Sequence, residues 1–139
     1  MRVVARRKAS GANRILGFAH DVEIDGGHSV RVDEPVEAGG TDTGPTPTRL
    51  VAAGLAACTA VTMEMYAERK GWEIGEVEVE VDVEYAGAAP TSFAVTVRLP
   101  EGLSDEQKER LLVIAGKCPV HKVIANATPV VVADRIEPL

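Results

Sequence analysis

The sequence has few of the features that mark an exported, membrane-spanning or nucleic-acid-binding protein. Its 139 residues contain two cysteines, Cys58 and Cys118, too few for a disulfide scaffold in a chain of this length. The formal net charge of −6 argues against a polyanionic partner, because binding to phosphate backbones depends on Lys and Arg. The longest nearly continuous apolar run, residues 50–61, is shorter than the ~20 residues that a membrane span needs. No secretory signal is apparent, so we expect a cytoplasmic protein that binds neither nucleic acid nor membrane.

Several common catalytic motifs are absent as well. There is no P-loop, no dinucleotide-binding glycine motif and no Gly-x-Ser-x-Gly elbow, and nothing else in the sequence predicts a cofactor. The remaining composition is that of an ordinary globular chain, with 45% hydrophobic and 26% charged residues. A chain of this length can bury one hydrophobic core, so we expect residues 1–139 to form a single domain.

The hydrophobic pattern predicts an α+β fold with the element order βββ-α-ββ-αα-β. Strict alternation of Val with Glu or Asp after Glu76 indicates a strand with one buried and one acidic face. Asp25, Gly26 and Gly27 tolerate the backbone of a tight hairpin turn. The expected strands lie near residues 3–4, within 15–33 as a hairpin, and at 76–85, 92–99 and 128–134.

The longest predicted helix is marked by signals at both of its ends. Thr46 and Pro47 suit the N-cap and first helical position, and Gly71 is the expected stop after Lys70. The first half of this helix is apolar on nearly every side, which predicts that the fold encloses it. Cys58 lies in that half.

Two shorter helices are predicted near the end of the chain. Ser104 and Gln107 form a capping-box pattern at the start of the first of them, which should stop near Gly116. Pro119 suits the first position of the last helix and places Cys118 at or beside its N-cap. The expected buried stripe of the earlier helix is Leu111, Leu112 and Ile114.

The two cysteines are the candidate reactive groups. A thiol is a good nucleophile only as the thiolate, and a helix N-terminus or a nearby cation lowers its pKa. Cys118 has the first advantage by position, whereas apolar surroundings should raise the pKa of Cys58 unless another residue offsets them. An inert packing role for both cysteines stays open at this point. The residues that could activate Cys58 are Arg14, Arg31, Arg49 and His28.

A zinc site is a further alternative. Cys118 and His121 form a C-x-x-H pair, to which Cys58 could add a third ligand. No fourth ligand is apparent, and structural zinc sites almost always use four. We therefore predict no metal site.

The order of several short motifs resembles one known family. Between His28 and Trp72 the chain reads DEP, GGTDTGP, AACTA and MYAERKGW, and CPVHK follows at Cys118. Together these segments are similar to the family of osmotically inducible protein C and the organic hydroperoxide resistance proteins (OsmC/Ohr). The resemblance implies an OsmC-like fold, in which an antiparallel sheet wraps around a long central helix. It also implies an intertwined homodimer with two equivalent active sites at its interface.

The resemblance further implies a two-cysteine peroxidase cycle. Cys58 stands in the position of the peroxidatic thiol, which would reduce an organic hydroperoxide and become a sulfenic acid. Cys118 stands in the position of the resolving thiol, which would condense with that sulfenic acid to a disulfide. A dithiol reductant would then restore both thiols.

This sequence departs from the family pattern at two places. Relatives usually carry a Glu in the first turn of the central helix that holds an active-site Arg, where this chain has Thr48 and Arg49. Many relatives also have an Arg at the position of Gly27. We expect Arg49, and after it Arg31, to supply the positive charge. The altered site leaves an alternative, a non-enzymatic protein of the same fold that binds an anionic ligand or serves as a structural stress protein.

Overall fold

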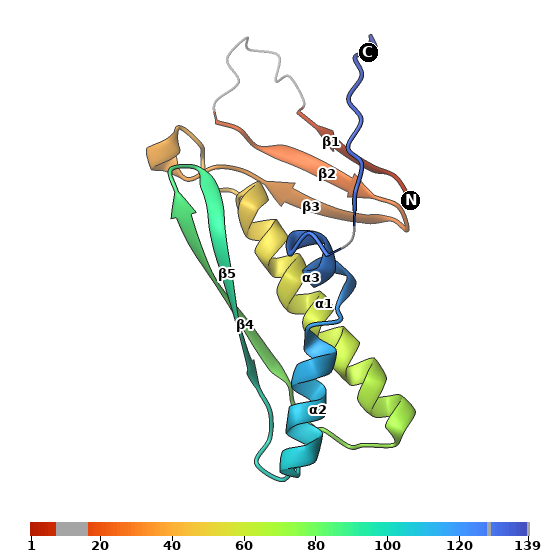
Figure 1. Ribbon diagram of the computed structural model, residues 1–139. Coiled ribbons are helices and arrows are strands. Elements are labelled where there is room, and N and C mark those ends of the chain that lie inside the picture. The colour runs from red at the N-terminus through yellow and green to blue at the C-terminus, as the bar shows by residue number, and fades with distance from the viewer. Residues whose placement is uncertain (8–16, 128, 139) are drawn as a thin grey trace. The chain divides into compact units, whose positions relative to one another are not determined.

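The computed structural model describes residues 1–7, 17–127 and 129–138, which form two compact units, residues 1–51 and the remainder. The α+β class is confirmed, and the predicted order of elements holds through the third helix (Figure 1). The unit boundary falls inside the longest helix. In chain order the elements are β1 (Val3–Arg6), β2 (His20–Ile24), β3 (His28–Val32), the 3-10 helix η1 (Val36–Ala38), α1 (Pro47–Lys70), β4 (Glu78–Ala86), β5 (Ala89–Arg98), α2 (Asp105–Ala115) and α3 (Pro119–Ile124).

The first unit contains an antiparallel three-stranded sheet in the order β1-β2-β3. Val22 in the middle strand lies opposite Ala5 on one side and Val30 on the other. The β2–β3 turn uses Gly26 and Gly27, whose φ angles of 96° and 81° lie in the left-handed region that glycine tolerates. The predicted hairpin and its turn are therefore confirmed, apart from residues 15 and 16, which lie outside the described residues.

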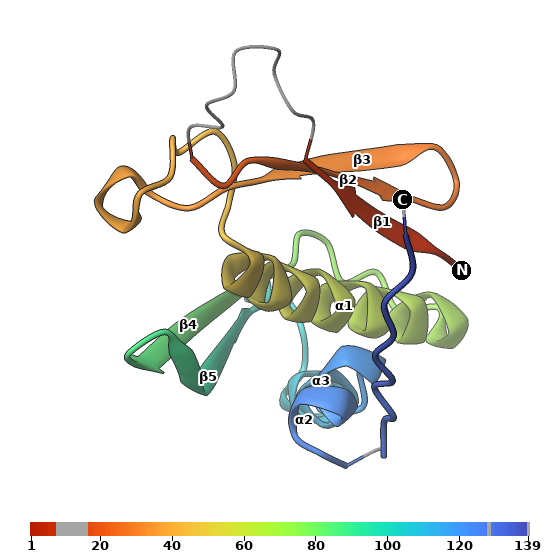
Figure 2. The same cartoon turned by 90° about the horizontal axis from the view of Figure 1, so that it is seen from above.

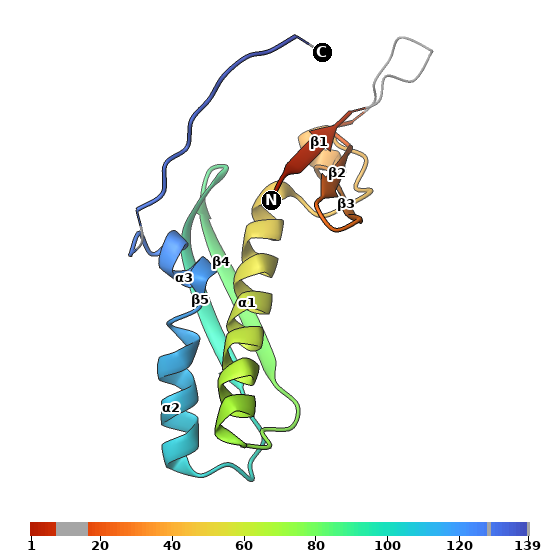
Figure 3. The ribbon, with the colours of Figure 1, turned by 90° about the vertical axis from the view of Figure 1, so that its right-hand side faces the viewer.

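The second unit contains most of α1, the β4–β5 hairpin, α2 and α3. The backbone N–H of Arg49 donates to Thr46 Oγ1 at 3.3 Å, and Gly71 follows the last turn of α1 with a φ of 67°. Both predicted ends of the long helix are thus confirmed. The hairpin, α2 and α3 lie on the same side of α1 (Figures 2 and 3).

The core of the second unit forms between these elements. Met63 of α1 and Leu111 of α2 are fully buried, and partly buried Val79 and Val97 of the hairpin pack against their cluster. The predicted stripe of α2 is wrong at Leu112, which is 65% exposed, while Ala115 is buried in its place. Residues 111, 114 and 115 share one helical face, and position 112 is turned about 100° away from residue 111.

The first half of α1 is less enclosed than the sequence predicted. Val51 and Val61 are 46% and 50% exposed in the single chain, so one face of the helix is open. By length and composition α1 is able to cross a membrane. One face of the helix is nevertheless buried, as in the core helix of a globular protein. Its buried residues are Leu55, Thr59, Met63 and Ala67.

The strand predicted over 128–134 is not formed in its described part, residues 129–134. Val131 and Val132 there are 90% and 82% exposed. A strand needs a neighbouring strand for its backbone hydrogen bonds, and no described strand of this chain pairs with the segment. The sequence pattern detected the β-propensity of the valines but could not supply a partner.

Candidate active site

Cys58 and Cys118 come together in the second unit. Cys58 lies in the middle of α1, and Cys118 is the N-cap residue of α3. The Cys118 thiol donates a hydrogen bond to the Cys58 sulfur, and neither sulfur is in a disulfide. Cys118 is fully buried, whereas Cys58 is partly exposed. The two thiols are therefore close enough to interact, and Cys58 is the more exposed of the pair.

The surroundings of Cys58 favour its ionised form. Burial raises the pKa of this thiol and is the largest single influence on it. Hydrogen bonds from the Cys118 thiol, the Val120 backbone N–H and the Thr62 hydroxyl together outweigh burial, so the pKa is lowered. Thr62 contributes least of the three donors, and its hydroxyl also donates to the Cys58 carbonyl oxygen at 2.7 Å. Cys58 thus ionises more easily than an isolated cysteine thiol.

The surroundings of Cys118 have the opposite effect and raise the pKa of its thiol. Burial, followed by the neighbouring Cys58 sulfur, raises the pKa of its thiol. The His121 backbone N–H, 3.4 Å from the Cys118 sulfur, and the Thr59 side chain offset only part of this effect. The N-terminal amide of α3 thus favours the Cys118 thiolate, as its position predicted, but burial outweighs this effect. The Val120 amide of the same helical turn serves Cys58 instead.

A small cavity of about 170 Å³ lies beside these residues. Its polar lining comes from Thr59 and His121, and its apolar walls include Val95, Val97 and Leu112. The cavity therefore suits a compact, mostly apolar group.

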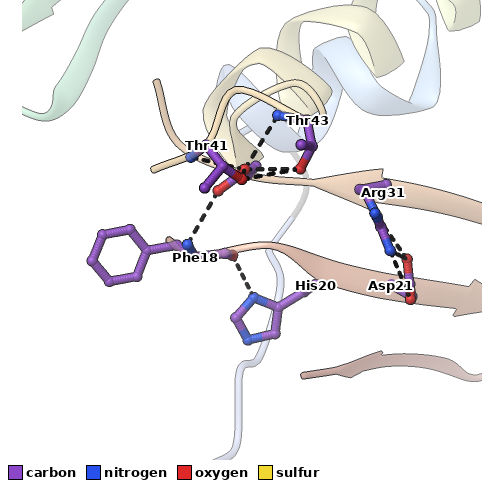
Figure 4. Close-up of polar contacts among 7 residues, drawn as sticks. Phe18, His20, Asp21, Arg31, Thr41 and Thr43 are labelled. Atoms are coloured by element: carbon purple, nitrogen blue, oxygen red, sulfur yellow. Dashed lines mark hydrogen bonds and ion pairs between the residues drawn. The ribbon is translucent and has the colours of Figure 1, made fainter. Parts of the chain in front are cut away.

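Arg31 lies on β3 in the first unit and is paired with Asp21 of β2 (Figure 4). Its Nε is 3.0 Å from Asp21 Oδ1, and its second guanidinium nitrogen is 3.3 Å from Oδ2. Both side chains are about half exposed. The guanidinium is therefore engaged within its own sheet. His28 is exposed at the start of β3, and Arg14 lies outside the described residues.

Arg49 lies in the first turn of α1. Cys58 is nine positions further along the helix, which is about two and a half turns, so the two residues lie on opposite sides of α1. Spacing along the helix thus does not bring Arg49 to Cys58. The residues that contact the reactive sulfur, Thr62 and Val120, were missed from sequence. Thr62 could have been found, because position i+4 lies on the same helical face as Cys58.

The DEP and GGTDTGP motifs have a structural purpose within the first unit. Asp33 is 1% exposed, and its carboxylate accepts hydrogen bonds from the backbone and hydroxyls of Thr41 and Thr43 (Figure 4). These bonds, with Thr41 first, hold the pKa of Asp33 well below its usual range. Gly40 is required because a Cβ there would lie 1.7 Å from the Glu34 carbonyl oxygen. The loop is therefore fixed around one buried carboxylate.

The described residues add no ligand to the pair of Cys118 and His121 that the sequence offered for a metal site. Among residues 1–7, 17–127 and 129–138, no group of three or more His, Cys, Asp or Glu side chains is arranged to hold a metal ion. Cys118 and His121 stay close, but the contact between them is from the His121 backbone N–H to the sulfur. We therefore interpret Cys58 and Cys118 as a pair of thiols and not as metal ligands.

By its fold and its cysteine pair, this chain is a small α+β protein with two neighbouring thiols. Residues 40–133, about two thirds of the chain, match the family of OsmC-like proteins, and the chain belongs to this family. A search of curated proteins found no match.

Solved structures support the same assignment. The organic hydroperoxide resistance protein OhrB of Bacillus subtilis is 28% identical, with a TM-score of 0.54 over 88% of this chain and 87% of that one. An organic hydroperoxide resistance protein OsmC from Legionella pneumophila is 26% identical, with a TM-score of 0.58 over 88% and 87%. An OsmC-like protein from Mycoplasma pneumoniae is 20% identical and shares the fold, with a TM-score of 0.65 over 89% and 86%.

Proposed function

We propose that this protein is a thiol-dependent peroxidase that reduces organic hydroperoxides with Cys58 and Cys118. The observation that carries the proposal is the contact between two thiols with opposite pKa shifts, lowered at Cys58 and raised at Cys118. A two-cysteine cycle needs one ionised thiol for attack on the peroxide and a second thiol in reserve beside it. The pair supplies both.

The first step consumes the peroxide. The Cys58 thiolate attacks one peroxide oxygen, so that an S–O bond forms and the O–O bond breaks. The alkoxide leaves with the electron pair of that bond and takes up a proton to become an alcohol. Cys58 is then a sulfenic acid.

The second and third steps restore the enzyme. The Cys118 sulfur attacks the Cys58 sulfur, the S–O bond breaks, and the departing hydroxide leaves as water with the Cys118 proton. A dithiol reductant then reduces the resulting disulfide by two thiol exchanges and becomes a disulfide itself. Such a cycle suits a reducing compartment, and we propose a cytoplasmic location.

An organic peroxide is favoured over hydrogen peroxide by the cavity that Thr59, the residue after Cys58, helps to line. The cavity beside Thr59 has apolar walls, and an alkyl group gains free energy by leaving water for such a lining. The names of the Bacillus and Legionella structures point to the same substrate class for those proteins.

We also propose that the protein acts as a homodimer. The open face of α1 carries Val51, Val61 and Met65, which are 46%, 50% and 55% exposed. Gly54, on the same helix, would let another backbone approach closely, since a Cβ built there meets no atom within 4 Å. A second copy covering this face would provide the enclosure that the sequence of α1 predicts.

Arg49, and after it Arg31, are the proposed cations at the Cys58 thiol, although spacing along α1 does not by itself bring Arg49 to Cys58 and Arg31 is paired with Asp21. A nearby cation would favour the thiolate further and supplement the hydrogen bonds to Cys58.

The proposal is tested by turnover of cumene hydroperoxide or tert-butyl hydroperoxide with a dithiol donor. Wild-type protein should consume peroxide, Cys58→Ser should not, and one equivalent of peroxide should produce a Cys58–Cys118 disulfide detectable by mass spectrometry. Equal rates for wild type and C58S would rule the peroxidase out. An anionic ligand whose binding is abolished by Arg49→Ala but not by C58S would instead favour a binding protein.

A further inference from the structure

Thr59 has a buried hydroxyl that no described residue satisfies. Its side chain is 1% exposed, and Oγ1 makes no hydrogen bond with any described residue. Native proteins rarely leave a buried hydroxyl unpaired, because the group has lost its water without gaining a partner. A Val in this place would fill the same volume without that disadvantage.

The hydroxyl lies near the second cysteine, because Thr59 lines one cavity with His121, whose backbone N–H contacts the Cys118 sulfur. Thr59 follows Cys58 on α1, and its side chain is close enough to Cys118 to favour that thiolate. In the reduced protein Cys118 is protonated, donates to Cys58 and accepts from the His121 backbone N–H. Cys58 on α1 is the titratable group that raises the Cys118 pKa, and His121 on α3 lines the same cavity as Thr59. The Cys118 sulfur is therefore the group to which the Thr59 hydroxyl can donate once that sulfur is ionised.

We propose that Thr59 is a positioning residue that donates a hydrogen bond to Cys118 whenever this sulfur becomes a thiolate. The inference rests on the proposed peroxidase cycle. After reaction with peroxide, Cys58 is a neutral sulfenic acid and no longer needs a proton shared from Cys118. As Cys118 loses its proton and attacks, the S–S bond forms, the S–O bond breaks, and the hydroxide leaves with that proton as water. The Thr59 O–H stabilises the negative charge on Cys118 during this step.

The same contact serves the reduction of the disulfide. Cys58 is the partly exposed member of the pair, so the thiolate of a dithiol attacks the Cys58 sulfur. The S–S bond breaks, and Cys118 leaves with the electron pair as a thiolate, which then takes up a proton. A better stabilised thiolate leaves faster. The second thiol of the reductant then releases Cys58 from the mixed disulfide.

The test compares Thr59→Val, which removes the hydroxyl, with Thr59→Ser, which keeps it. Thr96→Val, at an exposed site on β5, is the matched control. In a single turnover with tert-butyl hydroperoxide, T59V should form sulfenic acid, trapped by dimedone, at the wild-type rate. Its disulfide should then form about tenfold more slowly, as expected for loss of a hydrogen bond to a charged group. T59S and T96V should resolve at nearly the wild-type rate.

A second measurement does not depend on peroxidase activity. In a C58S background Cys118 is the sole cysteine, so its titration can be followed by thiolate absorbance in the ultraviolet. Adding T59V should raise the Cys118 pKa, and adding T59S should leave it unchanged. T59V should also unfold no more easily than wild type, because the hydroxyl is unpaired in the reduced protein.

The outcomes separate this inference from the proposed function. Failure of wild type to consume peroxide would overturn the function, while the C58S titration would still decide whether Thr59 stabilises the Cys118 thiolate. Wild-type turnover with unchanged resolution and titration in T59V would overturn the inference alone. A parallel loss of stability and rate in T59V, with no change in the Cys118 pKa, would assign Thr59 a packing role and also overturn it.

Discussion

The backbone N–H of Val120 donates a hydrogen bond to the sulfur of Cys58, although the two residues are far apart in the sequence. Pro119 begins α3 and Cys118 caps it, so the first turn of this helix supplies both the second thiol and the amide. Apart from substitution by proline, no change of side chain at position 120 removes this backbone N–H. The contribution of each side chain to the reactivity of Cys58 can therefore be measured against a constant background.

The first prediction concerns the hydrogen bond from Cys118 to Cys58. Cys118→Ala removes a donor that favours the Cys58 thiolate, so the pKa of Cys58 rises. At neutral pH, alkylation of Cys58 by iodoacetamide should slow about five- to tenfold, and its pH profile should move to higher pH. Cys118→Ser keeps an O–H donor and should show a smaller change. Identical profiles for C118A and wild type would contradict the assigned hydrogen bond.

The second prediction concerns the proposed cation. If Arg49 supplies the positive charge, Arg49→Ala raises the Cys58 pKa, because the thiolate loses a favourable charge interaction. Arg49→Lys keeps the charge and should leave the alkylation profile near that of wild type. An unchanged profile for R49A would remove Arg49 from the mechanism and make Arg31→Ala the next variant to measure.

Local signals in the sequence predicted much of the fold. Thr46, Gly71, Ser104 and Pro119 act through their own backbone neighbours, so the helix ends that they mark could be identified without knowing the tertiary structure. The strand expected over 128–134 could not be settled in this way, because a strand depends on a partner that local sequence does not identify.

The site was predictable only in part, for the same reason. The motifs identified Cys58 and Cys118, but the pKa of each thiol depends on groups that the fold brings from elsewhere. Every residue type except proline has a backbone N–H, so the sequence does not show that the one at Val120 would contact Cys58. Burial of Cys118, which raises its pKa, is likewise a property of packing.

The third prediction uses two adjacent leucines on α2. Leu111 is fully buried against Met63, whereas Leu112 is 65% exposed. Leu111→Ala should lower the free energy of unfolding by about 2–5 kcal/mol, because it removes buried methyl groups and leaves a cavity. Leu112→Ala should change it by less than about 0.5 kcal/mol, as surface substitutions usually do. Urea denaturation of the two variants measures the difference, and equal losses would contradict the assigned face of α2.

The fourth prediction concerns pH and the loop around Asp33. The folded pKa of this carboxyl lies below its unfolded value, so its ionised form contributes stability above about pH 4. That contribution is lost as the pH falls below this value toward the folded pKa. Asp33→Asn should therefore lower the midpoint of thermal unfolding at pH 7. Below about pH 4, the midpoint of this variant should depend less on pH than that of wild type. The exposed Asp82→Asn is the control, and a D33N curve parallel to wild type would contradict the role of Asp33.

The fifth prediction tests the proposed dimer through the open face of α1. Val61 is 50% exposed in the single chain, and a second copy covering it would bury an apolar side chain. Val61→Glu would place a charge in that interface, where an unpaired carboxylate is unfavourable, and should shift the protein from dimer toward monomer. Val113→Glu is the matched control, because Val113 is 52% exposed on α2, outside the proposed interface. Sedimentation velocity at several concentrations distinguishes the variants. A monomeric wild type, or a V61E variant that dimerises as tightly as V113E, would remove this face of α1 from the assembly.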